Sequence, residues 1–175
     1  MDEAARLREM LDKQACTEVI YRFARGLDRR DEALLSSLFH PDGTDDHGYF
    51  KGTGSEFVAW VLPLLAGMER TQHFIGNVLV EITGDEARSE CSFIASHDLT
   101  AADGTLQRMT AAGRYLDTFR RHGGLWKLLH RRAVYDWNAV EPRTDAWDRS
   151  SGSARDFGKP GCEDSVYAHF AAGST

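Results

Sequence analysis

The order of two hydrophobic patterns along the chain is the feature that most restricts its fold. Up to about residue 70, apolar side chains recur every three or four residues, as they do on one face of a helix. From there to residue 137, β-branched and aromatic residues fill segments of strand length that are separated by short turns containing glycine. Helices that come first and strands that follow indicate an α+β fold, with helices packed on one face of a curved sheet.

Three helices are predicted in the first part of the chain. The first carries apolar residues at helical spacing from Leu7 to Leu27, with Asp2 as its N-cap and Asp28 at its end. Asp31 caps a short second helix, which His40-Pro41-Asp42-Gly43 brings to an end because proline cannot continue it.

The third helix follows a short strand or ribbon that we expect over residues 44–52. Thr53 and Glu56 have the spacing of a capping box at its start, and Pro63 is expected to kink it. Four strands are then predicted, over residues 71–82, 88–100, 106–121 and 125–137. Their short turns favour an antiparallel meander.

The last part of the chain is poor in apolar residues. We therefore expect an α+β domain over residues 1–140 and an irregular C-terminal arm over residues 141–175. A partly disordered tail is the alternative.

Charge and composition exclude several functional classes. Lysine and arginine number 21 against 27 aspartates and glutamates, and the resulting charge of −6 repels phosphate backbones, so no nucleic-acid partner is expected. No apolar run approaches the roughly 20 residues of a membrane span, and the charged segment 1–10 does not resemble a signal peptide, so no membrane partner is expected. Cys16, Cys91 and Cys162 are widely spaced and form no CxxC pair, which indicates free thiols and a cytoplasmic location.

Alternation along the strands selects candidate site residues. His97 shares a side of its strand with Phe93, which places it on the face that the helices cover. His73 has apolar neighbours on both sides of its strand, so alternation leaves its orientation open. Arg131 shares a side with Leu125 in the fourth strand.

Asp28, His73, His97 and Arg131 could converge in one cavity. A histidine beside a carboxylate is held in one tautomer and made more basic, so it can remove a proton from carbon next to an activating group. A histidine that only packs is the alternative from spacing alone. Asp28 and the two histidines could also imitate a metal triad, but no HxH or HExxH pair occurs, so no metal is expected.

Other motifs carry less chemistry. Asp45-Asp46-His47-Gly48 is a second polar cluster, which we interpret as a solvated turn from which His47 or Tyr49 could reach the mouth of a pocket. GxSxG, P-loop and GxGxxG motifs are absent from the sequence, so local signals for a serine hydrolase, a nucleotide hydrolase and a dinucleotide site are lacking.

Several short motifs, in order and spacing, resemble the SnoaL-like branch of the nuclear transport factor 2-like superfamily over about residues 5–140. They are Gly26-Leu27-Asp28-Arg29-Arg30-Asp31, Leu38-Phe39-His40-Pro41-Asp42-Gly43, Gly52, Thr71-Gln72-His73-Phe74-Ile75-Gly76-Asn77, and Gly124-Leu125-Trp126-Lys127 leading to Arg131. The resemblance implies a cone, in which a bent antiparallel sheet and helices enclose a deep apolar pocket. It also implies a homo-oligomer, either a dimer or a trimer.

Within this branch, the chain is similar to the scytalone dehydratase, bile-acid 7α-dehydratase and hexachlorocyclohexane dehydrochlorinase groups of enzymes, which perform cofactor-free elimination with an Asp–His dyad. The similarity implies that His73 is the base and that Asp28 holds it. It matches His97 to a second strand histidine, which we expect to bind or protonate the departing hydroxyl group. It matches Arg131 to a strand arginine that stabilises the oxyanion or the leaving group. Phe23 stands where some members carry a lysine or a tyrosine.

The resemblance thus implies a lyase of the dehydratase type, with no cofactor and no metal, acting on a small apolar hydroxy-carbonyl substrate. The expected substrate-binding residues are Phe23, Tyr49, Trp60, Phe93 and Met109. An isomerase or polyketide cyclase with the same pocket, a non-catalytic β subunit of an aromatic-ring dioxygenase, and a pure ligand-binding module are the alternatives.

Overall fold

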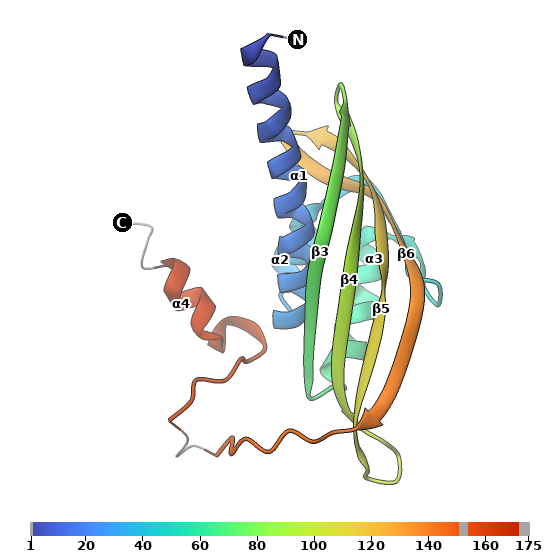
Figure 1. Ribbon diagram of the computed structural model, residues 1–175, viewed down its shortest axis with the longest axis vertical. Coiled ribbons are helices and arrows are strands. Elements are labelled where there is room, and N and C mark those ends of the chain that lie inside the picture. Colours follow the sequence, from blue (N-terminus) through green and yellow to red (C-terminus); the bar gives the residue numbers. More distant parts are fainter. Residues whose placement is uncertain (1, 151–153, 172–175) are drawn as a thin grey trace.

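A long helix and a bent sheet face each other in the computed structural model of the chain, which describes residues 2–150 and 154–171 (Figure 1). The elements in chain order are α1 (Glu3–Arg29), α2 (Glu32–Leu38), β1 (Phe39–Asp46), β2 (Lys51–Thr53), α3 (Gly54–Ala66), β3 (Arg70–Thr83), β4 (Glu86–Thr100), β5 (Leu106–His122), β6 (Leu125–Pro142), the 3₁₀ helix η1 (Gly161–Glu163) and α4 (Ser165–Ala171).

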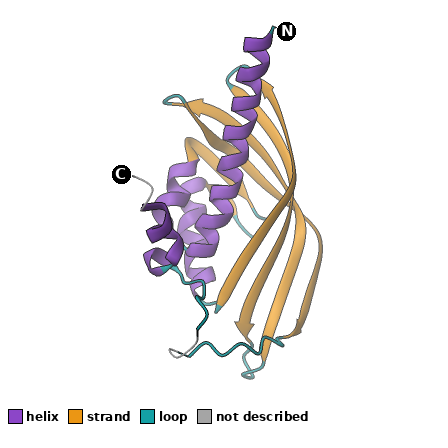
Figure 2. Ribbon diagram, turned by 60° about the vertical axis from the view of Figure 1, so that its left-hand side comes forward, coloured by secondary structure: helices purple, strands orange, loops and turns teal. Residues whose placement is uncertain are grey.

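The six strands form one open sheet in the order β2-β1-β6-β5-β4-β3. Strands β3 to β6 form the predicted antiparallel meander. The sheet is nevertheless mixed, because β1 pairs with β6 in parallel. An entirely antiparallel sheet was therefore the wrong expectation, since β1 follows two helices and its partner β6 is the last strand in the chain order. The helices lie on one side of the curved sheet, which confirms the α+β fold (Figure 2).

Local signals place the starts of the helices as predicted. The side chains of Asp2 and Asp31 each accept a hydrogen bond from a backbone N–H group in the first turn of their helix. At α3, the Thr53 hydroxyl and the Glu56 carboxylate bond each other's backbone N–H groups, which is the predicted capping box. Helix α3 continues through Pro63 to Ala66.

A β-bulge in β3 resolves the orientation of His73. The pairing register with β4 shifts between Gly76 and Leu79. His73 lies on the inner face before this shift, and Val78 lies on the inner face after it. Apolar residues therefore alternate in two different phases along one strand, which explains why simple alternation left the question open.

A second bulge changes the face of Arg131. Phe119 of β5 pairs with Leu128 and the preceding Thr118 pairs with His130, so the register passes over one residue of β6. Arg131 is consequently fully buried, whereas Leu125 is exposed. The predicted grouping of these two residues on one side was wrong, because alternation does not continue across a bulge.

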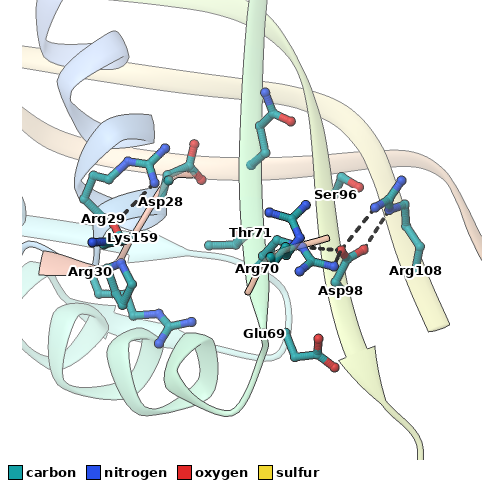
Figure 3. A pocket seen from close by; sticks show the side chains of 14 residues that line it. Asp28, Arg29, Arg30, Glu69, Arg70, Thr71, Ser96, Asp98, Arg108 and Lys159 are labelled. Carbon is teal, nitrogen blue, oxygen red and sulfur yellow. Dashed lines mark hydrogen bonds and ion pairs between the residues drawn. The ribbon is translucent and has the colours of Figure 1, made fainter. Parts of the chain in front are cut away.

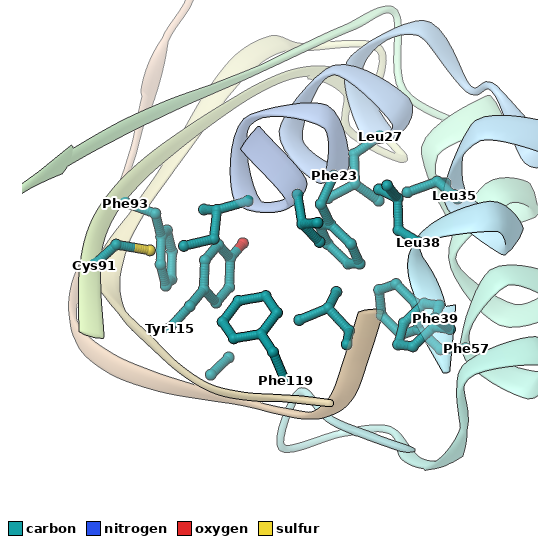
Figure 4. Packing of buried hydrophobic residues seen from close by; sticks show 14 of the residues in the cluster. Phe23, Leu27, Leu35, Leu38, Phe39, Phe57, Cys91, Phe93, Tyr115 and Phe119 are labelled. Carbon is teal, nitrogen blue, oxygen red and sulfur yellow. The ribbon is translucent and has the colours of Figure 1, made fainter. Parts of the chain in front are cut away.

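Aromatic rings fill the space between the helices and the sheet (Figure 4). Phe23 of α1 stacks on Phe57 of α3 with ring centres 5.7 Å apart. On the sheet, Phe93 and Tyr115 stack at 4.4 Å. Ring pairs of this kind add to the stabilisation that apolar burial provides.

The segment after β6 returns to the helices. The Tyr167 hydroxyl in α4 donates to the Asp31 carboxylate at 2.6 Å, and Arg29 forms an ion pair with Asp164 at 3.1 Å. This segment was expected to be irregular, and it includes the short helices η1 and α4 among its described residues. Residues 151–153 and 172–175 of the predicted arm lie outside the described residues.

Candidate active site

Asp28 is positioned by the sharp end of α1. A Cβ atom on Gly26 would lie 2.7 Å from the Leu35 side chain, so only glycine allows α2 to approach this closely. Arg30 adopts a left-handed conformation with φ of 52°, and its N–H group bonds the carbonyl groups of Gly26 and Leu27. The chain therefore reverses directly after Asp28.

The carboxylate of Asp28 binds both the ring and the backbone of His73. Its Oδ1 atom lies 2.7 Å from Nδ1 of His73, and the backbone N–H group of His73 donates to both carboxylate oxygens at 3.1 and 3.0 Å. β3 is an edge strand of the sheet, so one side of its backbone is open to partners other than a strand. The Asp28 side chain is only 10% exposed, and the His73 side chain is only 7% exposed.

This contact determines which nitrogen of His73 can act as a base. An ionised carboxylate only accepts hydrogen bonds, so Nδ1 carries the hydrogen. The second ring nitrogen, Nε2, is then left with its lone pair.

His97 lies beside this pair on β4. Its ring meets the His73 ring edge to face, with centroids 5.5 Å apart, and its Nδ1 atom lies 2.8 Å from the Thr71 hydroxyl oxygen. Burial lowers the pKa of His97 to about 4, and the neighbouring His73 acts in the same direction. His97 is therefore neutral near pH 7, and its ring can offer one N–H group as a hydrogen-bond donor.

His73 and His97 both line an apolar cavity of about 660 Å³. Four of the five predicted substrate-binding residues also line it: Tyr49, Trp60, Phe93 and Met109. A site of this size with mostly apolar walls and a few polar groups is typical of small-molecule binding.

Phe23 and Arg131 do not line this cavity. The Arg131 guanidinium is fully buried between the rings of Phe23 and Tyr115, at 4.0 and 4.2 Å from their centres. Asp117 accepts two hydrogen bonds from it, at 2.7 and 2.6 Å. The structure therefore brings Asp28, His73 and His97 together and places Arg131 in the core.

His47 lines the same cavity, and its position differs from the solvated turn that we expected. Its side chain is only 11% exposed, and its Nδ1 atom is hydrogen-bonded to the fully buried Asp45. Asp45 and His47 are two residues apart at the end of β1, so their side chains point to the same face. This spacing was the signal in the sequence that could have indicated the pair.

Asp28 is one of the residues that line a separate polar recess of about 340 Å³ (Figure 3). Several cationic side chains line it, but Arg70 and Arg108 both donate to Asp98. Burial would raise the pKa of Asp98, yet the hydrogen bonds from these two arginines hold it below its usual value. The recess is thus a network of paired charges, distinct from the apolar cavity.

Two further findings concern the described ranges 2–150 and 154–171. Within them, none of the helices is both long and apolar enough to cross a membrane. The same ranges contain no group of three or more histidine, cysteine, aspartate or glutamate side chains arranged to hold a metal ion.

The family model of the SnoaL-like domain matches residues 8–132. The chain belongs to the SnoaL-like family. The matched residues include Asp28, His73, His97 and Arg131. No curated protein matches this SnoaL-like sequence.

Several solved structures have the same fold. The Kfla4162 protein of Kribbella flavida is 21% identical, with a TM-score of 0.68 over 74% of this chain and 94% of that one. A scytalone dehydratase candidate from Novosphingobium aromaticivorans is 19% identical, with a TM-score of 0.67 over 83% and 97%. Hexachlorocyclohexane dehydrochlorinase LinA-type3 from Novosphingobium barchaimii is 18% identical, with a TM-score of 0.67 over 79% and 94%. These similarities show the fold, and the named relatives include a dehydratase candidate and a dehydrochlorinase.

Proposed function

We propose that this SnoaL-like protein is a lyase of the dehydratase type that works without a cofactor. The observation that carries the proposal is the 2.7 Å contact between Asp28 and the ring of His73, at the wall of an apolar cavity. The named dehydratase and dehydrochlorinase relatives support an elimination reaction.

His73 would take the proton from a carbon atom next to a carbonyl group. Asp28 would hold the ring and stabilise its imidazolium form, as the carboxylate of a catalytic triad does. A positioned general base of this kind increases the reaction rate by a factor of about 10²–10⁴.

His97 would bind the carbonyl oxygen of the substrate. It is neutral and lies beside His73, so it can donate a hydrogen bond where negative charge develops as the proton leaves carbon. The oxyanion role that the resemblance implies for Arg131 is not part of the proposal, because Arg131 is fully buried and bound to Asp117.

We propose a β-hydroxy ketone with one ring or two fused rings as the substrate. The cavity volume of about 660 Å³ exceeds that of such a molecule, and aromatic side chains such as Trp60 and Phe93 would pack against it. Loss of the proton next to the carbonyl group and loss of the β-hydroxyl group then produce a conjugated ketone and water.

The first test uses 3-hydroxy-1-tetralone, whose dehydration yields 1-naphthol after tautomerisation. We expect His73→Ala and Asp28→Asn each to lower kcat/KM by at least about 10², because each removes part of the base. His130→Ala is the matched control, since His130 hydrogen-bonds Thr44 on the sheet and does not line the cavity. Full activity in His73→Ala would contradict the assignment.

Product analysis separates the alternatives. A dehydratase releases a product lighter by one water, whereas an isomerase or a cyclase that keeps all atoms leaves the mass unchanged. A ligand-binding module, or the β subunit of a dioxygenase, would show no turnover and no effect of His73→Ala. The cytoplasmic location and the dimer or trimer stay predictions.

A further inference from the structure

A second aspartate–histidine pair includes a histidine, His47, that lines the cavity. Asp45 is the penultimate residue of β1, and His47 follows the strand directly. The Asp45 side chain is fully buried, and its Oδ1 atom is hydrogen-bonded to Nδ1 of His47. As at His73, the carboxylate leaves Nε2 as the ring nitrogen that is free to exchange a proton with a ligand.

His47 is the hydrogen-bonding partner that the structure provides for Asp45. The Oδ2 atom of Asp45 is buried and has no hydrogen-bond partner among the described residues. Arg131 lies opposite Asp45 in the β1–β6 pair, but its guanidinium donates two hydrogen bonds to Asp117. A buried carboxylate needs a hydrogen-bonding partner, and the ring of His47 supplies it.

The two histidines reach the cavity from opposite parts of the sheet. His73 lies on β3, at one edge, and His47 follows β1, which is separated from the other edge only by β2. The His47 ring stacks on Phe57 with centroids 4.8 Å apart and is tilted against Tyr115 at 5.7 Å. These contacts hold the ring in one orientation at the cavity wall.

Elimination of a hydroxyl group needs a proton donor in addition to the base. Hydroxide leaves carbon poorly, so an acid must supply a proton as the C–O bond breaks. His97 is deprotonated near neutral pH, because burial lowers its pKa to about 4. Arg131 does not line the cavity.

We propose that His47, held by Asp45, is a further catalytic residue, the general acid that protonates the departing hydroxyl group. This inference rests on the proposed dehydratase function. His73 takes the proton from carbon, and the electron pair of the C–H bond forms the C=C bond. The C–O pair moves to oxygen, which receives a proton from Nε2 of His47, and one water leaves. His73 then returns its proton to solvent, and His47 takes one up.

The decisive experiment compares two leaving groups on one ring system. Acetate departs without protonation, so 3-acetoxy-1-tetralone needs the base and not the acid, whereas 3-hydroxy-1-tetralone needs both. We expect His47→Gln to lower kcat for the hydroxyl substrate by about 10² and kcat for the acetate by no more than about threefold. Asp45→Asn should shift the ratio of the two rates in the same direction.

Matched controls exclude a structural explanation. His130→Gln and Asp46→Asn change the same residue types outside the cavity lining, where His130 bonds Thr44 and Asp46 pairs with Lys51. Both should leave the ratio as in the wild type. If His47→Gln lowers both rates equally, or neither, the acid role is overturned, because a misfolded site would affect both substrates alike.

A third measurement separates this inference from the proposed function. Exchange of the hydrogen next to the carbonyl group of 1-tetralone for solvent deuterium reports the base alone, since nothing leaves. Exchange that depends on His73, together with an unchanged ratio in His47→Gln, overturns only the acid role. If the wild type catalyses neither exchange nor elimination, the proposed function itself has failed, and the acid role with it.

Discussion

His73 and His97 have different surroundings, although their ring centroids lie only 5.5 Å apart. His73 has a carboxylate on Nδ1, whereas His97 has only the Thr71 hydroxyl. Burial lowers the pKa of His97 to about 4, and the nearby Asp28 and Asp98 carboxylates do not offset it. One residue type is therefore suited to accept a proton at one position and to remain a neutral donor at the next.

The pKa of His97 predicts that acid destabilises the protein. The folded pKa of about 4 lies below the ordinary value of 6.5, so the unfolded chain binds more protons between these pH values. The stabilisation is complete above pH 6.5 and is lost as the pH falls toward 4, about 2 kcal/mol of it between pH 7 and pH 5. Urea unfolding at both pH values should show that His97→Gln removes this part of the pH dependence. An equal dependence in the two proteins would contradict the prediction.

At the scale of single strands, β-bulges determine the shape of the sheet around the cavity. In β5 the register shifts between Ala112 and Gly113, close to Ala111 and Tyr115, which line the cavity. A Cβ atom on Gly113 would lie 2.1 Å from the carbonyl oxygen of Val134, so the two strands approach too closely there for any other residue.

Gly113→Ala should therefore destabilise the fold by roughly 2 kcal/mol or more, because the backbone itself has to move. Gly76→Ala is the matched control in the bulge of β3, where the nearest atom to a new Cβ is a ring carbon of Phe74 at 3.8 Å. Urea unfolding measures both changes. Equal stability of the two variants would contradict the steric argument.

At the scale of the whole molecule, the C-terminal segment packs back against α1, which carries Asp28, and against the start of α2. Tyr167 donates to the Asp31 carboxylate, which also caps α2. The Arg25 guanidinium lies over the rings of Tyr167 and Phe170, at 5.1 and 5.0 Å from their centres. We propose that the domain boundary lies near residue 140 and that this segment is a docked arm.

Tyr167→Phe should loosen the arm and leave the sheet intact. The change removes one hydrogen bond, worth about 1 kcal/mol, which corresponds to roughly fivefold faster hydrogen exchange in α4. Hydrogen exchange of α4, compared with that of β4 in the same sample, measures the effect. Unchanged protection of α4, or equal loss of protection in both elements, would contradict the docking of the arm through Tyr167.

Short-range chemistry determined much of the fold. The helix starts at Asp2, Asp31 and Thr53 depend on side-chain bonds to the next turn, and they are visible in the sequence. The glycine turns between the last four strands are equally local, so the meander was predictable. His97 was placed correctly on the inner face because β4 keeps its alternation up to that residue.

Contacts between distant segments depended on the tertiary structure. Asp28 and His73 are 45 residues apart, and no local rule brings them together, although the family resemblance pointed to both. Two bulges decided the faces of His73 and Arg131, because one extra residue reverses all later side chains in a strand. The parallel pairing of β1 with β6 placed His47 at the cavity, in hydrogen-bonding contact with the buried Asp45, since partner choice follows from how the whole sheet closes over its core.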